Sequence, residues 1–212
     1  MSFESASGVV LGRHMVREGD VLLSLFLKGM GLTSASARGA ATGKVRFGGG
    51  TEPLVWGVFN LYHGRAGKKY LRDVDVADDM LPLRGRPEAL FAAARWAKLL
   101  KRHLMKDTEG RHPADKLLAN LYWNMKLLCS PELPVEAVEW RFIRRWLMDW
   151  GLAPDLPRCA DCGLEGLELL RRAAAARAKD FLFLAPNLLR ELESHRRLFH
   201  NASRRAESFL EM

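Results

Sequence analysis

The sequence predicts an α+β protein in which an N-terminal β-barrel is followed by an α-helical domain. Short apolar runs separated by glycine-rich turns fill the first eighty residues, which is typical of strands. No helical period separates these runs, so a small barrel is favoured over a βαβ fold. Beyond that point apolar residues recur at a spacing of three and four, as in amphipathic helices. We therefore expect a barrel over 1–80 and a helical domain over 81–212.

Five segments are expected to form the barrel strands. The second of them shows the clearest pattern, because every other residue from Val21 to Leu27 is apolar and would share one face. The turn between the last two contains Gly64 and Gly67. The five segments are 9–16, 20–28, 31–40, 54–62 and 69–78.

Helices are expected through the rest of the chain, interrupted at prolines and glycines. One helix should end at Gly151, because glycine is favoured just past the last helical turn. In the same helix a stripe of large apolar residues, from Trp140 to Trp150, is predicted to face the core. The expected helices cover 87–107, 114–129, 135–151, 164–184, 187–199 and 201–212.

Composition narrows the class of protein. The formal net charge is +8, which favours polyanionic partners such as nucleic acid or anionic lipid but fixes no fold. No stretch approaches the roughly 20 uncharged apolar residues of a membrane span. The N-terminal residues lack the features of a signal peptide, and only three cysteines are present. We expect a cytoplasmic protein with no membrane partner.

The strongest local signal is a one-sided charge distribution in the predicted barrel. Between Lys28 and Arg72 eight basic residues stand against the single acid Glu52. Such a field suits a phosphate backbone, and barrel loops of this kind can follow a single strand. A flexible, solvated loop without a ligand is the alternative. The predicted DNA-binding residues are Lys28, Arg38, Lys44, Arg46, Arg65, Lys68, Lys69 and Arg72.

Order and spacing of several motifs resemble the RecO family of DNA repair proteins. The chain carries an opening GVVLGRHMVREGD, a basic loop ARGAATGKVRFGGGTEP, the segment WLMDWGLAPDLPRCADCG and a closing R-x-x-x-S-F-L. The loop departs from the family pattern at Ala41 and Thr42, where the family has basic residues. In the loop and the following strand the matching positions are Arg38 (for a lysine), Gly39, Ala40, Lys44, Arg46, Phe47, Gly49, Pro53, Leu61 and Tyr62.

The resemblance implies an OB-fold barrel and a recombination mediator that is not an enzyme and needs no cofactor. Such a protein would bind single- and double-stranded DNA, anneal complementary strands, and help to load RecA with RecR and the single-stranded DNA-binding protein. It also implies that the helical domain binds the acidic C-terminal tail of that last protein. Arg141 would take the main role, with Arg144 and Arg145 beside it; a solvated Arg141 is the alternative.

Cys159 and Cys162 have the spacing of half a zinc finger, but no second pair is present. Zinc would require completion by His195 and His200, and a redox dithiol is a third interpretation. We favour a degenerate zinc-finger remnant without metal. The rival functions are a zinc-dependent regulatory or enzymatic protein, and an RNA-binding OB module. The six histidines are scattered, and no nucleophile motif supports catalysis.

Overall fold

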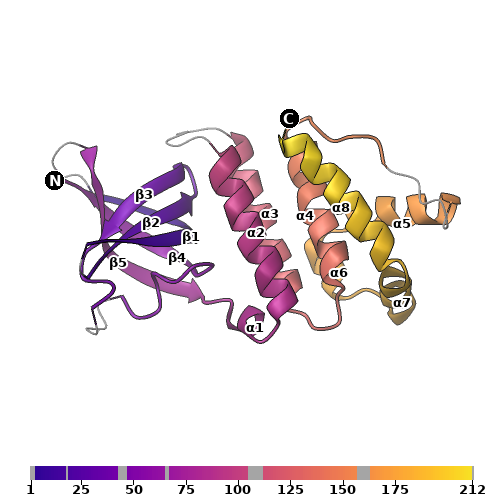
Figure 1. Cartoon of the computed structure of the whole chain (residues 1–212), viewed down its shortest axis with the longest axis horizontal. Coiled ribbons are helices and arrows are strands. Elements are labelled where there is room, and N and C mark those ends of the chain that lie inside the picture. Colours follow the sequence, from indigo (N-terminus) through magenta and orange to yellow (C-terminus); the bar gives the residue numbers. More distant parts are fainter. Residues whose placement is uncertain are drawn as a thin grey trace. The chain divides into compact units, whose positions relative to one another are not determined.

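A computed structural model describes residues 3–17, 19–42, 47–64, 67–104, 112–156 and 163–211. The predicted fold class is confirmed: a closed β-barrel precedes a set of α-helices (Figure 1). The chain divides into two compact units. One unit combines the residues up to Arg84 with the described part of Ala93–Leu118. The other combines Gly85–Ala92 with the described residues from Ala119 onward.

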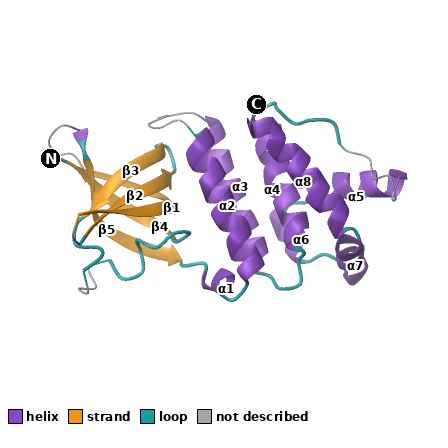
Figure 2. Cartoon of the chain, viewed as in Figure 1, coloured by secondary structure: helices purple, strands orange, loops and turns teal. Residues whose placement is uncertain are grey.

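The barrel has the strand order β1-β2-β3-β5-β4 and closes on itself (Figure 2). All neighbouring strands are antiparallel except β3 and β5, which meet in parallel where Ser36 pairs with Tyr70. The inward side chains include Leu23, Leu25 and Phe59, each fully buried, and Phe47 from the β3–β4 connection. The strands are β1 Phe3–Arg17, β2 Asp20–Leu27, β3 Gly31–Ala37, β4 Trp56–His63 and β5 Lys69–Asp78.

Strand β1 begins six residues earlier than expected and pairs with two strands. Its first part, Phe3–Val9, pairs with β4, and its second part pairs with β2 from Gly8 onward. Gly8 therefore lies opposite both Gly57 of β4 and Leu27 of β2. A Cβ atom at Gly8 would overlap the carbonyl oxygen of Phe26, so only glycine fits this crossing point.

Apart from the short α1, which was not predicted, the helices lie in the predicted regions, with two differences in where they are interrupted. The predicted helix over 164–184 is interrupted after Ala175, and the break expected at residue 200 lies instead at His195. The helices are α1 Leu81–Arg84, α2 Pro87–His103, α3 His112–Leu128, α4 Val135–Asp149, α5 Gly163–Ala175, α6 Ala178–Leu182, α7 Pro186–Ser194 and α8 Arg196–Glu211. None of them, within the described ranges, is long and apolar enough to cross a membrane.

Helix α4 is the centre of the second unit, and its predicted apolar stripe is confirmed. Trp140 and Trp146 are buried, and α8 and α5 pack against the helix. Its end is the expected glycine cap: Gly151 has φ +71°, and its N–H donates to the carbonyl of Met148. The N–H of Leu152 donates to the carbonyl of Leu147, which completes a Schellman motif.

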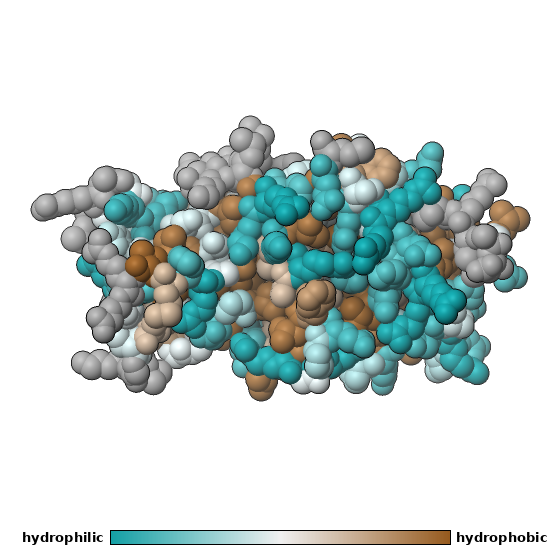
Figure 3. All heavy atoms as spheres, viewed as in Figure 1, coloured by the Kyte–Doolittle hydropathy of each residue, from teal (hydrophilic) through white to brown (hydrophobic). Residues whose placement is uncertain are grey.

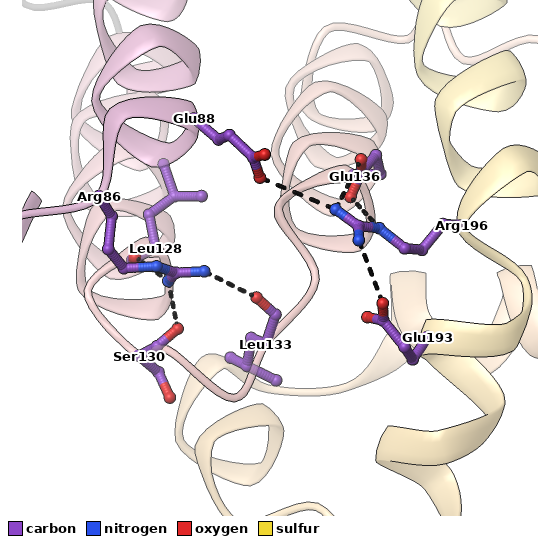
Figure 4. Close-up of polar contacts among 8 residues, drawn as sticks. All are labelled: Arg86, Glu88, Leu128, Ser130, Leu133, Glu136, Glu193 and Arg196. Atoms are coloured by element: carbon purple, nitrogen blue, oxygen red, sulfur yellow. Dashed lines mark hydrogen bonds and ion pairs between the residues drawn. The ribbon is translucent and has the colours of Figure 1, made fainter.

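Two arginines fasten the connections around α4 (Figure 4). The guanidinium group of Arg86 donates to the carbonyl oxygens of Leu128, Ser130 and Leu133, so it holds the α3–α4 loop. Arg196, the first residue of α8, donates to both carboxylate oxygens of Glu136 at 3.1 Å. Because these bonds favour the charged form, they raise the pKa of Arg196.

Candidate nucleic-acid interface

Three aromatic residues lie side by side on the outside of the barrel. Phe3 of β1 pairs with Tyr62 of β4, and Tyr62 pairs with Tyr70 of β5. Directly paired residues point to the same side of a sheet, so the three rings share the outer face. Phe3 is 60% exposed, and both tyrosines are half-buried. We call these three residues the aromatic strip.

Two arginines flank the aromatic strip. The rings of Tyr62 and Tyr70 are stacked, with centroids 5.2 Å apart and planes 17° apart. The Cζ atom of Arg38 lies 4.4 Å from the centroid of Tyr70. At the other end, the Cζ atom of Arg72 lies 5.7 Å from the centroid of Phe3. These arrangements are cation–π contacts, and they place a positive charge at each end of the aromatic strip.

The inward-facing neighbours of the aromatic strip form a charged cluster. Glu4 follows Phe3, His63 follows Tyr62 and Lys69 precedes Tyr70. The Oε1 atom of Glu4 lies 2.8 Å from Nε2 of His63, and its Oε2 atom lies 3.5 Å from Nζ of Lys69. Burial raises the pKa of Glu4. The hydrogen bond from His63 and the charge of Lys69 lower it by more than burial raises it, so the net shift of this pKa is downward.

A hollow beside the strip has room for a small planar group. Its volume is about 300 Å³, and its walls include Phe3, Asn60, Arg72 and Asp73. The side-chain amide of Asn60 donates to Asp73, which also lies 3.4 Å from the Nε atom of Arg72. Amide, guanidinium and ring thus meet at one place, which is the combination that stacks and positions nucleic-acid bases.

The structure brings together only part of the predicted DNA-binding set. Arg38, Lys69 and Arg72 border the aromatic strip, and Lys68 is exposed in the turn that precedes β5. Lys69 is engaged with Glu4 rather than turned to solvent. Lys28 lies at the far end of β2, about 20 Å along the strand from the level of Tyr70. Lys44, Arg46 and Arg65 lie outside the described residues.

Sequence reasoning missed the aromatic strip as a site. The pairing of Tyr62 with Tyr70 had a signal in the sequence: each is four residues from position 66, within the glycine-containing turn, so an antiparallel hairpin that turns there pairs them. The pairing of Phe3 with Tyr62 depends on barrel closure, and no local pattern predicts it.

The predicted partner-binding role of Arg141 conflicts with its position. Its side chain is only 2% exposed, so it is neither a surface ligand nor a solvated arginine. The Nη1 atom donates to Oδ1 of Asn124 at 2.7 Å, and Nε and Nη2 donate to the carbonyl of Ala176 at 3.3 and 3.0 Å. Burial, followed by the nearby charge of Arg145, lowers the pKa of Arg141 to about 10.

Arg144 and Arg145 also bind main-chain carbonyls. Arg145 donates to the carbonyls of Ala175 and Ala176, at 3.2 and 3.0 Å, next to the bonds from Arg141. Two arginines of α4 therefore satisfy the last carbonyls of α5, which explains why that helix ends there. Arg144 donates to the carbonyl of Pro154. Unlike Arg141, both keep partial exposure.

Cys159 and Cys162 lie outside the described residues, so the zinc-finger remnant stays a prediction. Of the histidines considered for metal, His195 lies at the α7–α8 junction with its Nδ1 atom 2.9 Å from the carbonyl of Glu191. His200 is exposed on α8. Among the residues that the structure describes, no three His, Cys, Asp or Glu side chains are grouped to hold a metal.

Comparison with known proteins agrees with the architecture. The family model for the N-terminal part of recombination protein O matches residues 1–80. A DNA repair protein RecO of Rubrobacter xylanophilus is 30% identical over 166 residues, which cover 77% of this chain and 63% of that protein. The RecO of Frankia casuarinae is 31% identical over 166 residues, covering 76% and 65%. The RecO of Acetivibrio thermocellus is 27% identical over 163 residues, covering 77% and 63%.

The fold defines an OB-like barrel protein with an appended helical unit. The first 80 residues of the chain match the N-terminal domain of the RecO family, and about three quarters of the chain is similar to DNA repair proteins RecO. The match spans slightly less than two thirds of the length of these three relatives, 63 to 65%.

Proposed function

We propose that this chain acts in DNA repair as a recombination mediator that binds single-stranded DNA on the barrel and is not an enzyme. The observation that carries the proposal is the aromatic strip with Arg38 and Arg72 at its ends. The exposed ring of Phe3 offers a stacking surface to bases of any sequence, and the guanidinium groups neutralise phosphates. The similarity to DNA repair proteins RecO supports the same substrate.

The proposed roles in annealing and in RecA loading rest on the resemblance to RecO proteins. The barrel would hold strands, including those of duplexes, and neutralised phosphates would let complementary strands approach and anneal. With RecR and the single-stranded DNA-binding protein, the chain would help to load RecA. Of the three arginines expected at the tail-binding site, Arg144 and Arg145 keep the partial exposure that a peptide contact needs.

The test is a titration with a fluorescent single-stranded oligonucleotide at several salt concentrations. Each phosphate contact on a single strand contributes about −0.7 to the slope of log K against log salt. The double variant Arg38→Ala/Arg72→Ala should therefore flatten the slope by roughly 1.4 and weaken binding for all sequences alike. The matched control is Arg84→Ala/Lys116→Ala, which removes the same charge from exposed positions on α1 and α3.

Three outcomes would count against the proposal. A parent slope near zero would remove nucleic acid as the ligand. Equal slopes for the double variant and its control would place the strand away from Arg38 and Arg72. Preference for RNA over DNA in competition would support the RNA-binding module instead.

A further inference from the structure

A second cationic surface runs along α8, in the unit that does not contain the barrel. Arg197, Asn201, Arg204 and Ser208 follow one another at helical spacing and are exposed on one side of the helix. His200 and Arg205 are exposed beside them. We call these six residues the α8 basic face: Arg197, His200, Asn201, Arg204, Arg205 and Ser208.

The packing of α8 fixes where this face points. The opposite side of the helix carries buried residues such as Phe199, Ala202 and Ala206, and α8 packs along α4. The α8 basic face is therefore held toward solvent by a rigid core contact. Figure 3 shows the hydrophilic surface over this helix in teal.

The basic side chains of this face are not used by the fold. Within the described part of the chain, the side chains of Arg197, His200, Arg204 and Arg205 have no hydrogen-bond or ion-pair partner. The neighbouring Arg196, in contrast, contacts Glu136 and Glu193 at 3.1 Å. Arg196 thus stabilises the fold, whereas the basic side chains of the α8 basic face remain unpaired.

The position of Arg197 is unfavourable for the helix itself. It lies in the first turn of α8, where no acidic residue is present. The amino end of a helix carries a partial positive charge, so a second positive charge is repelled there. Arg197 therefore does not stabilise the helix electrostatically, and an anion bound there would interact favourably with both the side chain and the helix end.

The shape of the surface indicates which anion. Every residue of the α8 basic face is polar, so an acidic peptide with aromatic anchors would find no apolar pocket in it. From Arg197 to Ser208 the face extends for about 16 Å along the helix axis, which suits a repeating polyanion. A hollow of about 240 Å³ at its start is lined by Glu136, Arg196, Arg197, His200 and Asn201, and the carboxylate of Glu136 is held by Arg196.

We propose that the α8 basic face binds the phosphate backbone of a nucleic-acid strand, as a second site separate from the barrel. This site goes beyond the proposed function, because it does not need the barrel to bind. With two sites on one chain, two strands can be held at once, and that is the arrangement annealing requires. The hollow at Arg197 accepts one phosphate group, and Arg204 and Arg205 contact phosphates further along.

The test uses the full chain and the triple variant Arg197→Ala/Arg204→Ala/Arg205→Ala. Its control, Arg171→Ala/Arg172→Ala/Arg190→Ala, has the same net charge but changes arginines that contact Glu168, Glu191 and Asn187 on α5 and α7. Two non-complementary oligonucleotides, one with a donor and one with an acceptor fluorophore, report by energy transfer whether one chain holds both. Circular dichroism melting verifies that both variants are folded.

The triple variant should lose the energy-transfer signal and flatten the salt slope by roughly 2, at about 0.7 per lost contact. The control should retain the signal. If the triple variant matches the control, the proposal is overturned. If the variant loses binding of an acidic peptide but holds both oligonucleotides, the face is a peptide site and the proposal is also overturned.

The same assay separates this inference from the barrel proposal. The variant Arg38→Ala/Arg72→Ala should retain oligonucleotide binding at α8 with a flatter salt slope than the parent. If this barrel variant binds as the parent does while the α8 triple variant fails, the barrel proposal falls and the α8 site stands.

Discussion

The guanidinium carbon of Arg38 lies 4.4 Å from the ring centroid of Tyr70, and the opposite neighbour of that ring is Tyr62. Tyr70 is thus held between a cation and a second ring on the outer face of the barrel. Bases that stack on this surface would meet rings whose positions are already fixed, so little ordering entropy is lost on binding.

Tyr70→Ala should weaken single-stranded DNA binding by about 0.5–1 kcal/mol, because Arg38 loses the ring that holds its guanidinium group in place. Tyr70→Phe keeps the ring and should bind as the parent does. Fluorescence titration at one fixed salt concentration measures both. Equal losses in the two variants would mean that the hydroxyl group, not the ring, makes the contact.

Arg141→Ala should destabilise the second unit by about 2–4 kcal/mol, since it leaves the buried Oδ1 of Asn124 without its donor and removes two of the bonds to the carbonyl of Ala176. Arg144→Ala should cost less, because that side chain is partly exposed. Urea denaturation followed by tryptophan fluorescence compares the two. A stable Arg141→Ala protein that fails only to bind the acidic tail peptide would restore the surface role predicted from the sequence.

Gly8→Ala should prevent the barrel from closing, because the new methyl group would overlap the carbonyl of Phe26. Gly49→Ala is the matched control, since nothing lies within 4 Å of a Cβ atom there. Thermal melting by circular dichroism should show a large loss for the first variant and almost none for the second. A normal melting temperature for Gly8→Ala would show that β1 can shift.

Glu4 gives the barrel a stability that depends on pH. Its pKa is lowered in the folded state from 4.5, so its contribution is present above that value and is lost as the pH falls through the lowered pKa. Glu4→Gln should be less stable than the parent near neutral pH, and the difference should shrink below about pH 4. Urea midpoints at both pH values measure it. A difference that is independent of pH would remove the ionic contact with His63 and Lys69 as its cause.

Local patterns in the sequence predict most of the fold, and the reasons are visible in single elements. The alternation in β2 and the apolar stripe of α4 are periodic, so they can be recognised without the tertiary structure. The end of α5 could not be predicted, because arginines of another helix, Arg141 and Arg145, terminate it. An alanine-rich run by itself favours an unbroken helix.

The candidate site, like the fold, was predicted only in part. A count of charges finds the cationic barrel, but it cannot separate Arg38, which lies on a ring, from Lys69, which is held by Glu4. It also treats Arg141 as a surface charge, although the fold buries it. Arg141 stands between Trp140 and Phe142 in the sequence, and counting charges takes no account of such apolar neighbours.

The two-sided pairing of β1 has a consequence for how the protein is made. Phe3 and Tyr62 are separated by about sixty residues along the chain, so during synthesis β1 leaves the ribosome well before its partner β4 exists. Pairs that distant close slowly and late compared with local hairpins. The β2–β3 hairpin can form first, and the barrel closes only after Tyr70 has emerged. Since that same step aligns Phe3, Tyr62 and Tyr70, the chain acquires its stacking surface only when barrel folding is finished, and a partly made barrel offers no complete surface to nucleic acid.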